Sequence, residues 1–220
     1  MRLTLIGMSG TGKSQWSKRL QKAGFRRYCC DAMIAAKLDH ELRRPDGSEM
    51  PMGAWMGFPY QEGYPAREAR YLACEIEVLH AILDKLEQTD ETENVVLDTT
   101  GSVVHTSADL LKRLRRSTTV AYLSVPSKQR QALLRAYMAQ PRPILWNGIY
   151  QPQPGESHEA ALDRCYARLL AKRERLYRRY ANVEIDYEHR CQAGFSVADF
   201  LRAAQPEPPT GNTSRSCHDL

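Results

Sequence analysis

Short apolar runs alternate with longer segments of helical period along this chain. The runs at 3–6, 25–30, 95–97, 119–123 and 183–185 predict five buried strands. Helices are expected over 13–22, 67–86, 107–115, 127–138, 158–180 and 197–204, with one more beginning at Asp31. Strands that alternate with helices predict an α/β fold, a five-stranded parallel sheet with helices on both faces.

Two stretches have neither the apolar run of a buried strand nor the period of a helix. Residues 43–66 contain four prolines and four glycines, and the stretch beginning at residue 141 contains four prolines by residue 156. We expect an irregular insertion over about 43–66 and a mobile lid over about 141–157. From residue 205 the chain is polar and rich in proline, which favours disorder. One domain over 1–204, followed by a disordered tail over 205–220, is therefore expected.

The composition is that of a globular protein. Hydrophobic residues make up 42% and charged residues 26%, which excludes a wholly disordered chain. A net charge of +5 suits an anionic ligand without requiring nucleic acid. No apolar run reaches ~18 residues, so no membrane span is expected. Six cysteines without a C-x-x-C pair, and no room for a signal peptide before the first glycine loop, favour reduced thiols and a cytoplasmic protein.

The first predicted strand leads into GMSGTGKS at 7–14, which fits G-x-x-x-x-G-K-[ST] in full. Such a loop curls so that its backbone N–H groups point at phosphate oxygens, while Lys13 adds a positive charge and the Ser14 hydroxyl can bind Mg²⁺. The expected backbone contacts come from Gly7, Gly10, Thr11 and Gly12. The motif predicts nucleotide binding but does not separate kinases from other NTPases. The N-K-x-D signature of small GTPases is absent from the sequence.

Several further stretches follow the loop in a familiar order. They are the aspartate of CCDAMI (29–34), DTTGSVV (98–104), RPIL (142–145), LLAKRERLY (169–177) and VEID (183–186). With the loop, they resemble the shikimate kinase family, within the nucleoside monophosphate kinase-like P-loop phosphotransferases. The resemblance runs from residue 3 to about residue 187. It implies a P-loop kinase fold, ATP as phosphoryl donor and a requirement for Mg²⁺.

The resemblance assigns roles to two aspartates. Asp31 matches the catalytic aspartate that faces both the acceptor hydroxyl and the transferred phosphoryl group, although an aspartate there could also cap a helix. The family usually has a second acid two residues earlier, where this chain has Cys29. Asp98, after the third strand, is expected to replace that acid beside the metal with Ser14, unless it only caps the following turn.

The resemblance also assigns the positive charges. Arg142 matches the lid arginine that closes over the ATP phosphates, and Arg135 matches an arginine that lies against the adenine. Arg173 matches the arginine that binds the substrate carboxylate, and Gly101 is the glycine kept from a triple-glycine substrate loop. Arg142 could instead be a solvated loop arginine, Arg135 a solvated side chain of the basic helix at 127–138, and Arg173 one of the many solvated arginines of the helix at 158–180.

The pattern departs from the family where the acceptor would bind. Counting from Glu75 places Leu72 where the family has a second carboxylate-binding arginine, and Arg67 and Arg70 would point elsewhere on an ideal helix. The sequence therefore predicts an ATP-dependent kinase that acts on a hydroxyl of a small anionic metabolite. Shikimate is the default acceptor by resemblance but is expected to be a poor one, and a monomer is favoured although the sequence does not determine the oligomeric state. Alternatives are a nucleotide or sugar-acid kinase, a non-catalytic nucleotide-gated binding protein, and RNA binding by the helix at 158–180.

Overall fold

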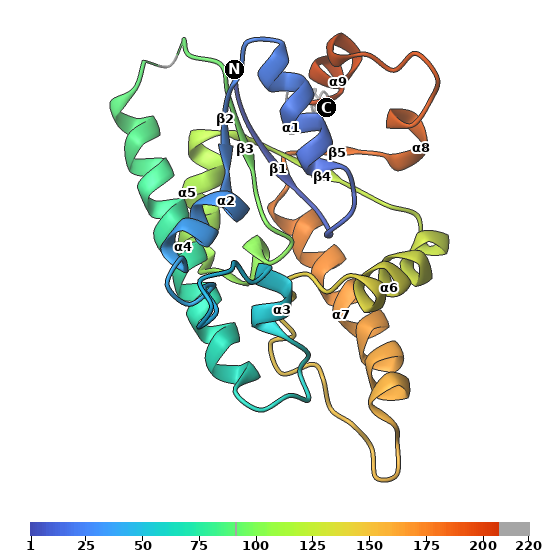
Figure 1. Cartoon of the computed structure of the whole chain (residues 1–220). Helices are drawn as coiled ribbons and strands as arrows, with labels where there is room; N and C mark the ends of the chain where they lie inside the picture. Colours follow the sequence, from blue (N-terminus) through green and yellow to red (C-terminus); the bar gives the residue numbers. More distant parts are fainter. Residues whose placement is uncertain (91, 207–220) are drawn as a thin grey trace, which may run out of the picture.

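The fold is taken from a computed structural model that describes residues 1–90 and 92–206. Over this range five parallel strands form one sheet in the order β2-β3-β1-β4-β5 (Figure 1). The strands are β1 (Arg2–Ile6), β2 (Arg26–Cys29), β3 (Val95–Asp98), β4 (Thr119–Leu123) and β5 (Val183–Ile185). The predicted five-stranded parallel α/β fold is confirmed. The tail expected to be disordered lies outside the described residues from position 207 onward.

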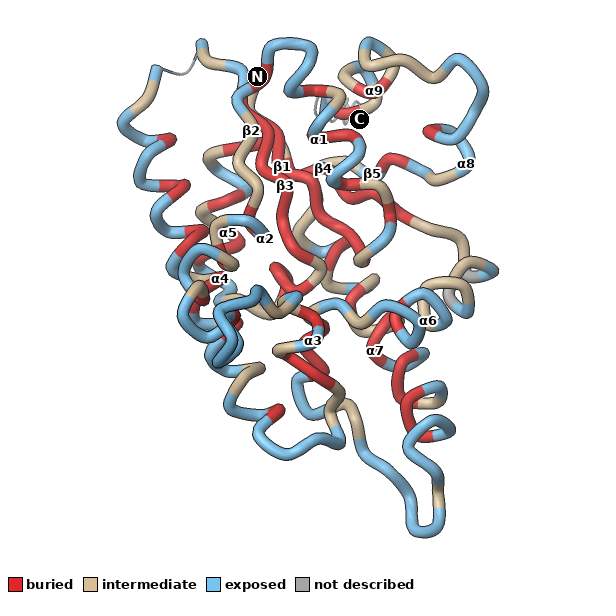
Figure 2. The backbone as a smooth tube through the Cα atoms, in the orientation of Figure 1, coloured by how far each residue is buried: buried red, intermediate tan, exposed pale blue. Residues whose placement is uncertain are grey.

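Alternate residues of the central strands face two separate cores. Leu3 and Leu5 of β1 pack with Trp16 and Phe200 on one face, whereas Ile6 belongs to the core on the opposite face. Because successive side chains of a strand point to opposite faces, an apolar run of this kind requires helices on both sides. Figure 2 shows the central strands β1, β3 and β4 as the buried centre of the molecule.

The helices cover the two faces of the sheet. Residues of α1 (Lys13–Lys22) and α9 (Val197–Ala203) form the smaller core, with α8 (Tyr187–Arg190) between β5 and α9. The larger core contains residues of α2 (Cys30–Lys37), α4 (Tyr64–Gln88), α5 (Ala108–Ser117) and α7 (His158–Tyr180), and α6 (Arg130–Ala139) packs against α7. Two 3₁₀ turns, η1 (Val103–His105) and η2 (Ser127–Gln129), join elements at the site end.

The expected irregular insertion over 43–66 is in part helical. It contains α3 (Met52–Met56), and α4 begins at Tyr64, three residues before the predicted start. Gly53 explains how α3 approaches residue 141 so closely, because a Cβ at this position would lie 1.9 Å from the Pro141 carbonyl oxygen. The insertion and the expected lid therefore pack against each other.

The segment expected to be a mobile lid, 141–157, packs against the domain in its first part. Ile144, Leu145 and Trp146 are buried, and the Tyr64 hydroxyl lies 2.7 Å from the Ile144 carbonyl oxygen and accepts from the Trp146 N–H at 3.1 Å. Buried side chains and paired backbone groups fix this part as a wall of the domain. Residues 151–155 are exposed and form an extended loop (Figure 2).

Two further expectations concern the state of the cysteines and the presence of membrane-spanning helices. Cys29, Cys30, Cys74, Cys165 and Cys191 are free thiols, and Cys217 lies outside the described residues. Among the described helices, none combines the length and apolar character that crossing a bilayer requires.

Candidate active site

The phosphate loop joins β1 to α1 at the carboxyl end of the sheet. Gly12 adopts φ 92°, a left-handed conformation that favours glycine, directly before the first residue of α1. A Cβ at Gly7 would lie 2.8 Å from the Leu123 carbonyl oxygen of β4, so glycine is needed for this close approach. The loop and the N-terminus of α1 together form the expected anion cradle.

Lys13 lies folded over its own loop. Its ammonium donates to the carbonyl oxygens of Gly7 and Met8, at 2.8 Å each. Burial lowers the pKa of Lys13 to about 8, and the nearby carboxylates of Asp31 and Asp98 partly oppose this shift. These two carbonyl oxygens are neutral acceptors, which a phosphate can replace with charged oxygens.

Asp98 ends β3 directly beside Ser14. Its Oδ1 accepts from the Ser14 hydroxyl at 3.3 Å, whereas its Oδ2 accepts from Ser17 at 2.9 Å and pairs with the Arg27 guanidinium at 2.6 Å. Cys29 is the register partner of Asp98 on the neighbouring strand. The two metal ligands expected from the sequence are therefore adjacent, and an arginine that the sequence analysis did not single out neutralises part of the carboxylate.

The described part of the chain holds no group of three or more His, Cys, Asp or Glu side chains arranged to bind a metal by themselves. The donors that fit Mg²⁺ are the Ser14 hydroxyl and the Oδ1 of Asp98. Mg²⁺ keeps several waters and is commonly held through one or two carboxylates together with substrate phosphates, so this small donor set suits it.

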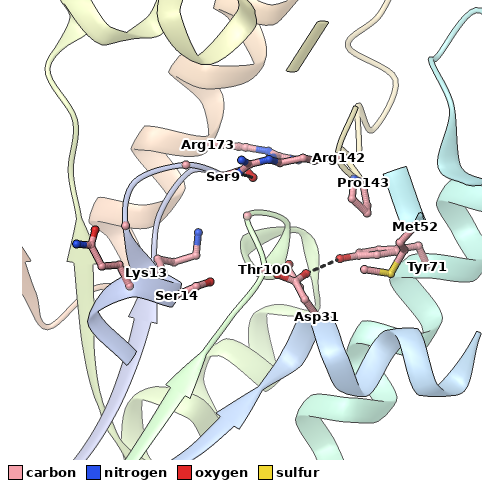
Figure 3. A pocket seen from close by; sticks show the side chains of 14 residues that line it. Ser9, Lys13, Ser14, Asp31, Met52, Tyr71, Thr100, Arg142, Pro143 and Arg173 are labelled. Carbon is pink, nitrogen blue, oxygen red and sulfur yellow. Dashed lines mark hydrogen bonds between the residues drawn. The ribbon is translucent and has the colours of Figure 1, made fainter. Parts of the chain in front are cut away.

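Asp31 faces the same cavity from the first turn of α2. The Tyr71 hydroxyl donates to its Oδ1 at 3.4 Å (Figure 3). The residue is open to the cavity, yet surrounding protein raises the pKa of its carboxyl, and Lys13 acts in the opposite direction. The N-cap of α2 is Cys29 and no side chain caps the helix, so the alternative capping role of Asp31 is not observed.

The cavity between these groups has a volume of about 500 Å³. Arg142 reaches it from the segment after α6 and donates to the Ser9 hydroxyl at 3.2 Å, and Arg173 reaches it from α7. Gly101 lies between them and the loop, because a Cβ at this position would be 3.2 Å from the Ser9 N and 3.5 Å from the Arg173 Nη1. The lining residues are Ser9, Gly10, Gly12, Lys13, Ser14, Gln15, Asp31, Met52, Tyr71, Thr100, Gly101, Arg142, Pro143 and Arg173 (Figure 3).

Glu75 forms a buried network under the 100–102 loop. Its carboxyl accepts from the hydroxyls of Thr100 and Ser102, and these two hydroxyls lie 2.8 Å apart. Burial raises the pKa of Glu75 to about 7. These two hydroxyls thus fix the backbone on either side of Gly101. This network was missed in the sequence because Glu75 is 25 and 27 residues away from the two hydroxyls.

Helix α4 faces the cavity with Tyr71 and not with Leu72. Leu72 is partly buried in the larger core and does not line the cavity. Arg67 donates to the backbone carbonyls of Met56 and Glu62, and Arg70 pairs with Glu41 at 2.8 Å. Among the described residues, α4 therefore brings a phenol to this side of the cavity and no guanidinium.

The structure does not bring Arg135 into this cavity. Arg135 is exposed on α6 and lines a separate hollow with residues of α7 such as Leu162. The residues of α6 that approach the phosphate loop are Leu133, Ala136 and Tyr137, which line a smaller hollow with Gly10 and Arg142. A contact between Arg135 and the nucleotide base stays an expectation from the resemblance.

No protein-family model matches the chain, and no curated protein sequence matches it either. Several solved structures match the chain. A shikimate kinase from Acinetobacter baumannii in complex with shikimate is 20% identical, covers 91% of this chain and 87% of its own, and has a TM-score of 0.57. A shikimate kinase from Bacteroides thetaiotaomicron is 20% identical, covers 92% of this chain and 94% of its own, and has a TM-score of 0.57. One from Aquifex aeolicus is 18% identical, covers 92% of this chain and 95% of its own, and has a TM-score of 0.56. The chain therefore has the fold of the shikimate kinases, an α/β P-loop kinase fold.

Proposed function

We propose that this protein belongs with the shikimate kinase-like enzymes and transfers the γ-phosphoryl group of ATP to a hydroxyl of a small anionic metabolite. The observation that carries the proposal is one cavity that holds Lys13, Arg142 and Arg173 around the carboxyl of Asp31. Three cations suit the negative charge of a nucleotide and an anionic acceptor, and one carboxylate among them suits a hydroxyl that must lose its proton.

The negative charge of the acceptor is argued from Arg173. Its side chain is 3% exposed, and in the described structure no carboxylate lies within ion-pair distance of it. Its hydrogen-bond acceptors are the His105 ring and the Leu145 carbonyl, both neutral. The buried Glu75 carboxyl interacts with Arg173 electrostatically but forms no ion pair with it. A buried charge without a direct ion-pair partner is costly, so an anionic group of the substrate is the natural partner.

The residues divide the transfer between them. The Asp31 carboxylate accepts the proton of the acceptor hydroxyl as its oxygen bonds to the γ-phosphorus, and the bond from that phosphorus to the β–γ bridging oxygen breaks. Lys13 exchanges its two carbonyl acceptors for phosphate oxygens, and Arg142 stabilises the charge on the transferred group. Mg²⁺, held beside Ser14 and Asp98, would neutralise charge on the phosphates.

We propose that shikimate itself is a poor acceptor. Arg142 and Arg173 are the arginines among the described lining residues, and α4 contributes Tyr71 and no guanidinium. An arginine–carboxylate hydrogen bond contributes roughly 1.5–3 kcal/mol, so the loss of one lowers affinity by about ten- to a hundredfold. Tyr71 and Met52 offer instead one hydroxyl and an apolar wall.

The basic helix α7 is consistent with a small-molecule enzyme. Arg178 pairs with Glu174 at 2.7 Å and Glu184 at 3.1 Å, and Arg164 pairs with Glu156 at 2.6 Å. Part of its positive charge is therefore neutralised by neighbouring carboxylates. This arrangement favours a solvated helix face over a nucleic-acid site.

The test is an ADP-release screen with Mg²⁺ and ATP against a panel of hydroxylated metabolites that includes shikimate, sugar acids and nucleosides. We expect turnover with an anionic member of the panel and none in Lys13→Ala. Turnover that survives in Lys13→Ala would show that the phosphate loop is not the site. Thermal stabilisation by ATP without transfer to any panel member would identify a nucleotide-binding protein instead of a kinase.

A further inference from the structure

The Arg173 guanidinium is held along one edge by protein acceptors. Its Nε–H donates to His105 Nε2 at 3.1 Å, and its Nη2 donates to the Leu145 carbonyl oxygen at 2.7 Å. In a guanidinium these two groups form the side-on fork, which suits bidentate binding of a carboxylate. That fork is occupied, so the end of the guanidinium, with Nη1 beside Gly101, is the part that a ligand can reach.

The contact with Arg173 determines the protonation of His105. An arginine N–H can only donate, so His105 Nε2 must be the unprotonated nitrogen of a neutral ring. The proton then lies on Nδ1, which is 3.3 Å from the side-chain amide of Asn147. The Asn147 atom at this distance is Nδ2, which is also a donor. Two donors cannot pair, so we assign the flipped amide, in which the Asn147 oxygen accepts from Nδ1–H.

The surroundings keep the ring neutral. His105 is in η1, and the cations Lys172 and Arg173 of α7 face it. Burial, reinforced by these two charges, lowers the pKa of His105 to about 3. A second proton would also place an N–H against the N–H of Arg173, so protonation is opposed by geometry as well.

We propose that His105 is a positioning residue that, as the Nδ1–H tautomer, fixes Arg173 so that only the end of its guanidinium binds the acceptor. The other end of the chain of contacts is Asn147, whose N–H donates to Glu68 of α4 at 2.8 Å. These contacts connect segment 144–147, η1 and α7 around Arg173, the residue proposed to bind the acceptor. This inference rests on the proposed function for the ligand, whereas the tautomer and the guanidinium orientation belong to the free protein.

The test compares two substitutions and one control. His105→Gln keeps an oxygen acceptor near the position of Nε2, and His105→Leu keeps the bulk without an acceptor. The control is His80→Leu, because His80 also contacts an arginine, Arg113, at 3.3 Å, but on the exposed surface of α4. We expect the acceptor KM to rise about tenfold in His105→Leu, to recover largely in His105→Gln, and to stay unchanged in His80→Leu. The ATP KM should change little in all three.

A second measurement needs no acceptor. The ¹⁵N spectrum of histidine-labelled protein distinguishes protonated from unprotonated ring nitrogens, and His105 is assigned by its loss in His105→Gln. We expect Nδ1 protonated and Nε2 unprotonated between about pH 6 and 8. An Nε2–H tautomer, a cationic ring, or an acceptor KM in His105→Leu equal to wild type overturns the proposal. If no panel member is phosphorylated, the proposed function fails while the spectrum still decides the role of His105.

Discussion

Glu75 is 1% exposed, and its carboxyl accepts from two hydroxyls on the loop that carries Gly101. Burial raises its pKa to about 7 from an ordinary value of 4.5. Between these two values the folded protein holds a proton that the unfolded chain has released. Stability therefore falls as the pH rises through this window, because the native state binds more protons than the unfolded state. Glu75→Gln removes the titration and keeps a group of the same shape.

The magnitude follows from the two pKa values of Glu75, 4.5 unfolded and about 7 folded. One pKa unit corresponds to about 1.36 kcal/mol, so the contribution lost across the window is about 3 kcal/mol. We expect the free energy of unfolding of Glu75→Gln, relative to wild type, to rise by about this amount between about pH 5 and 8. Urea unfolding at several pH values measures it directly.

The control is Glu77→Gln on the same helix. Glu77 is exposed and pairs with Lys37 at 2.8 Å, which lowers its pKa below the tested window. Its substitution should leave the pH dependence of stability nearly unchanged. A Glu75→Gln difference that stays constant with pH would refute the argument, because the carboxyl would then titrate alike in the folded and unfolded chains.

Three further substitutions test the site. Tyr71→Phe removes a hydrogen bond that lowers the pKa of Asp31. The acidic limb of the pH profile of kcat/KM should therefore move to higher pH, and a limb that does not move would contradict a role for Asp31 as base. Arg27→Gln frees the Oδ2 of Asp98 from its ion pair, so Mn²⁺, as a spectroscopic probe for Mg²⁺, should bind more tightly in the presence of ADP; equal or weaker binding would place the metal away from Asp98. Tyr64→Phe leaves the buried Trp146 N–H without its acceptor and should lower the free energy of unfolding by about 1–3 kcal/mol in urea; no loss would show that segment 144–146 does not depend on this contact.

The parts of the site that could be predicted from the sequence are local in the chain. The phosphate loop is eight consecutive residues between a strand and a helix, and each residue of the pattern has its own physical reason. Asp31 and Asp98 follow strands of a parallel sheet, so they necessarily reach the same edge of it. The convergence of Arg173 with them came from the resemblance, because nothing in a basic helix distinguishes one arginine from its neighbours.

The buried face of α4 could be predicted only in part. The three-and-four spacing of Leu72, Ile76, Leu79 and Leu83 selects one face, on which Leu79 and Leu83 are buried and Leu72 and Ile76 partly buried. The buried residues Tyr71 and Glu75, which lie near the cavity, were not selected. A phenol and a carboxyl are read as polar in such a pattern, and each residue skipped rotates the expected face by about 100°. Residues buried because they form hydrogen bonds within the protein are the ones that hydrophobic periodicity cannot identify.

The burial of segment 144–146 could not be predicted for a different reason. Four prolines and no helical period correctly exclude a helix, but they do not indicate whether an irregular segment is mobile. Trp146 is buried against Tyr137, Tyr150 and Tyr166, contacts between residues of α6, α7 and the segment itself. Only the tertiary structure shows that these aromatic rings meet.

The position of Lys13 has a consequence for the proposed binding of a nucleotide. A buried ammonium with a pKa of about 8 carries its full charge in only part of the population near that pH. Phosphate oxygens favour the charged form, so complex formation draws protons from solution in mildly alkaline buffer. For the proposed kinase, nucleotide affinity is thereby coupled to pH through a side chain that has no part in the proposed proton transfer, and the heat of association is expected to depend on the ionisation enthalpy of the buffer.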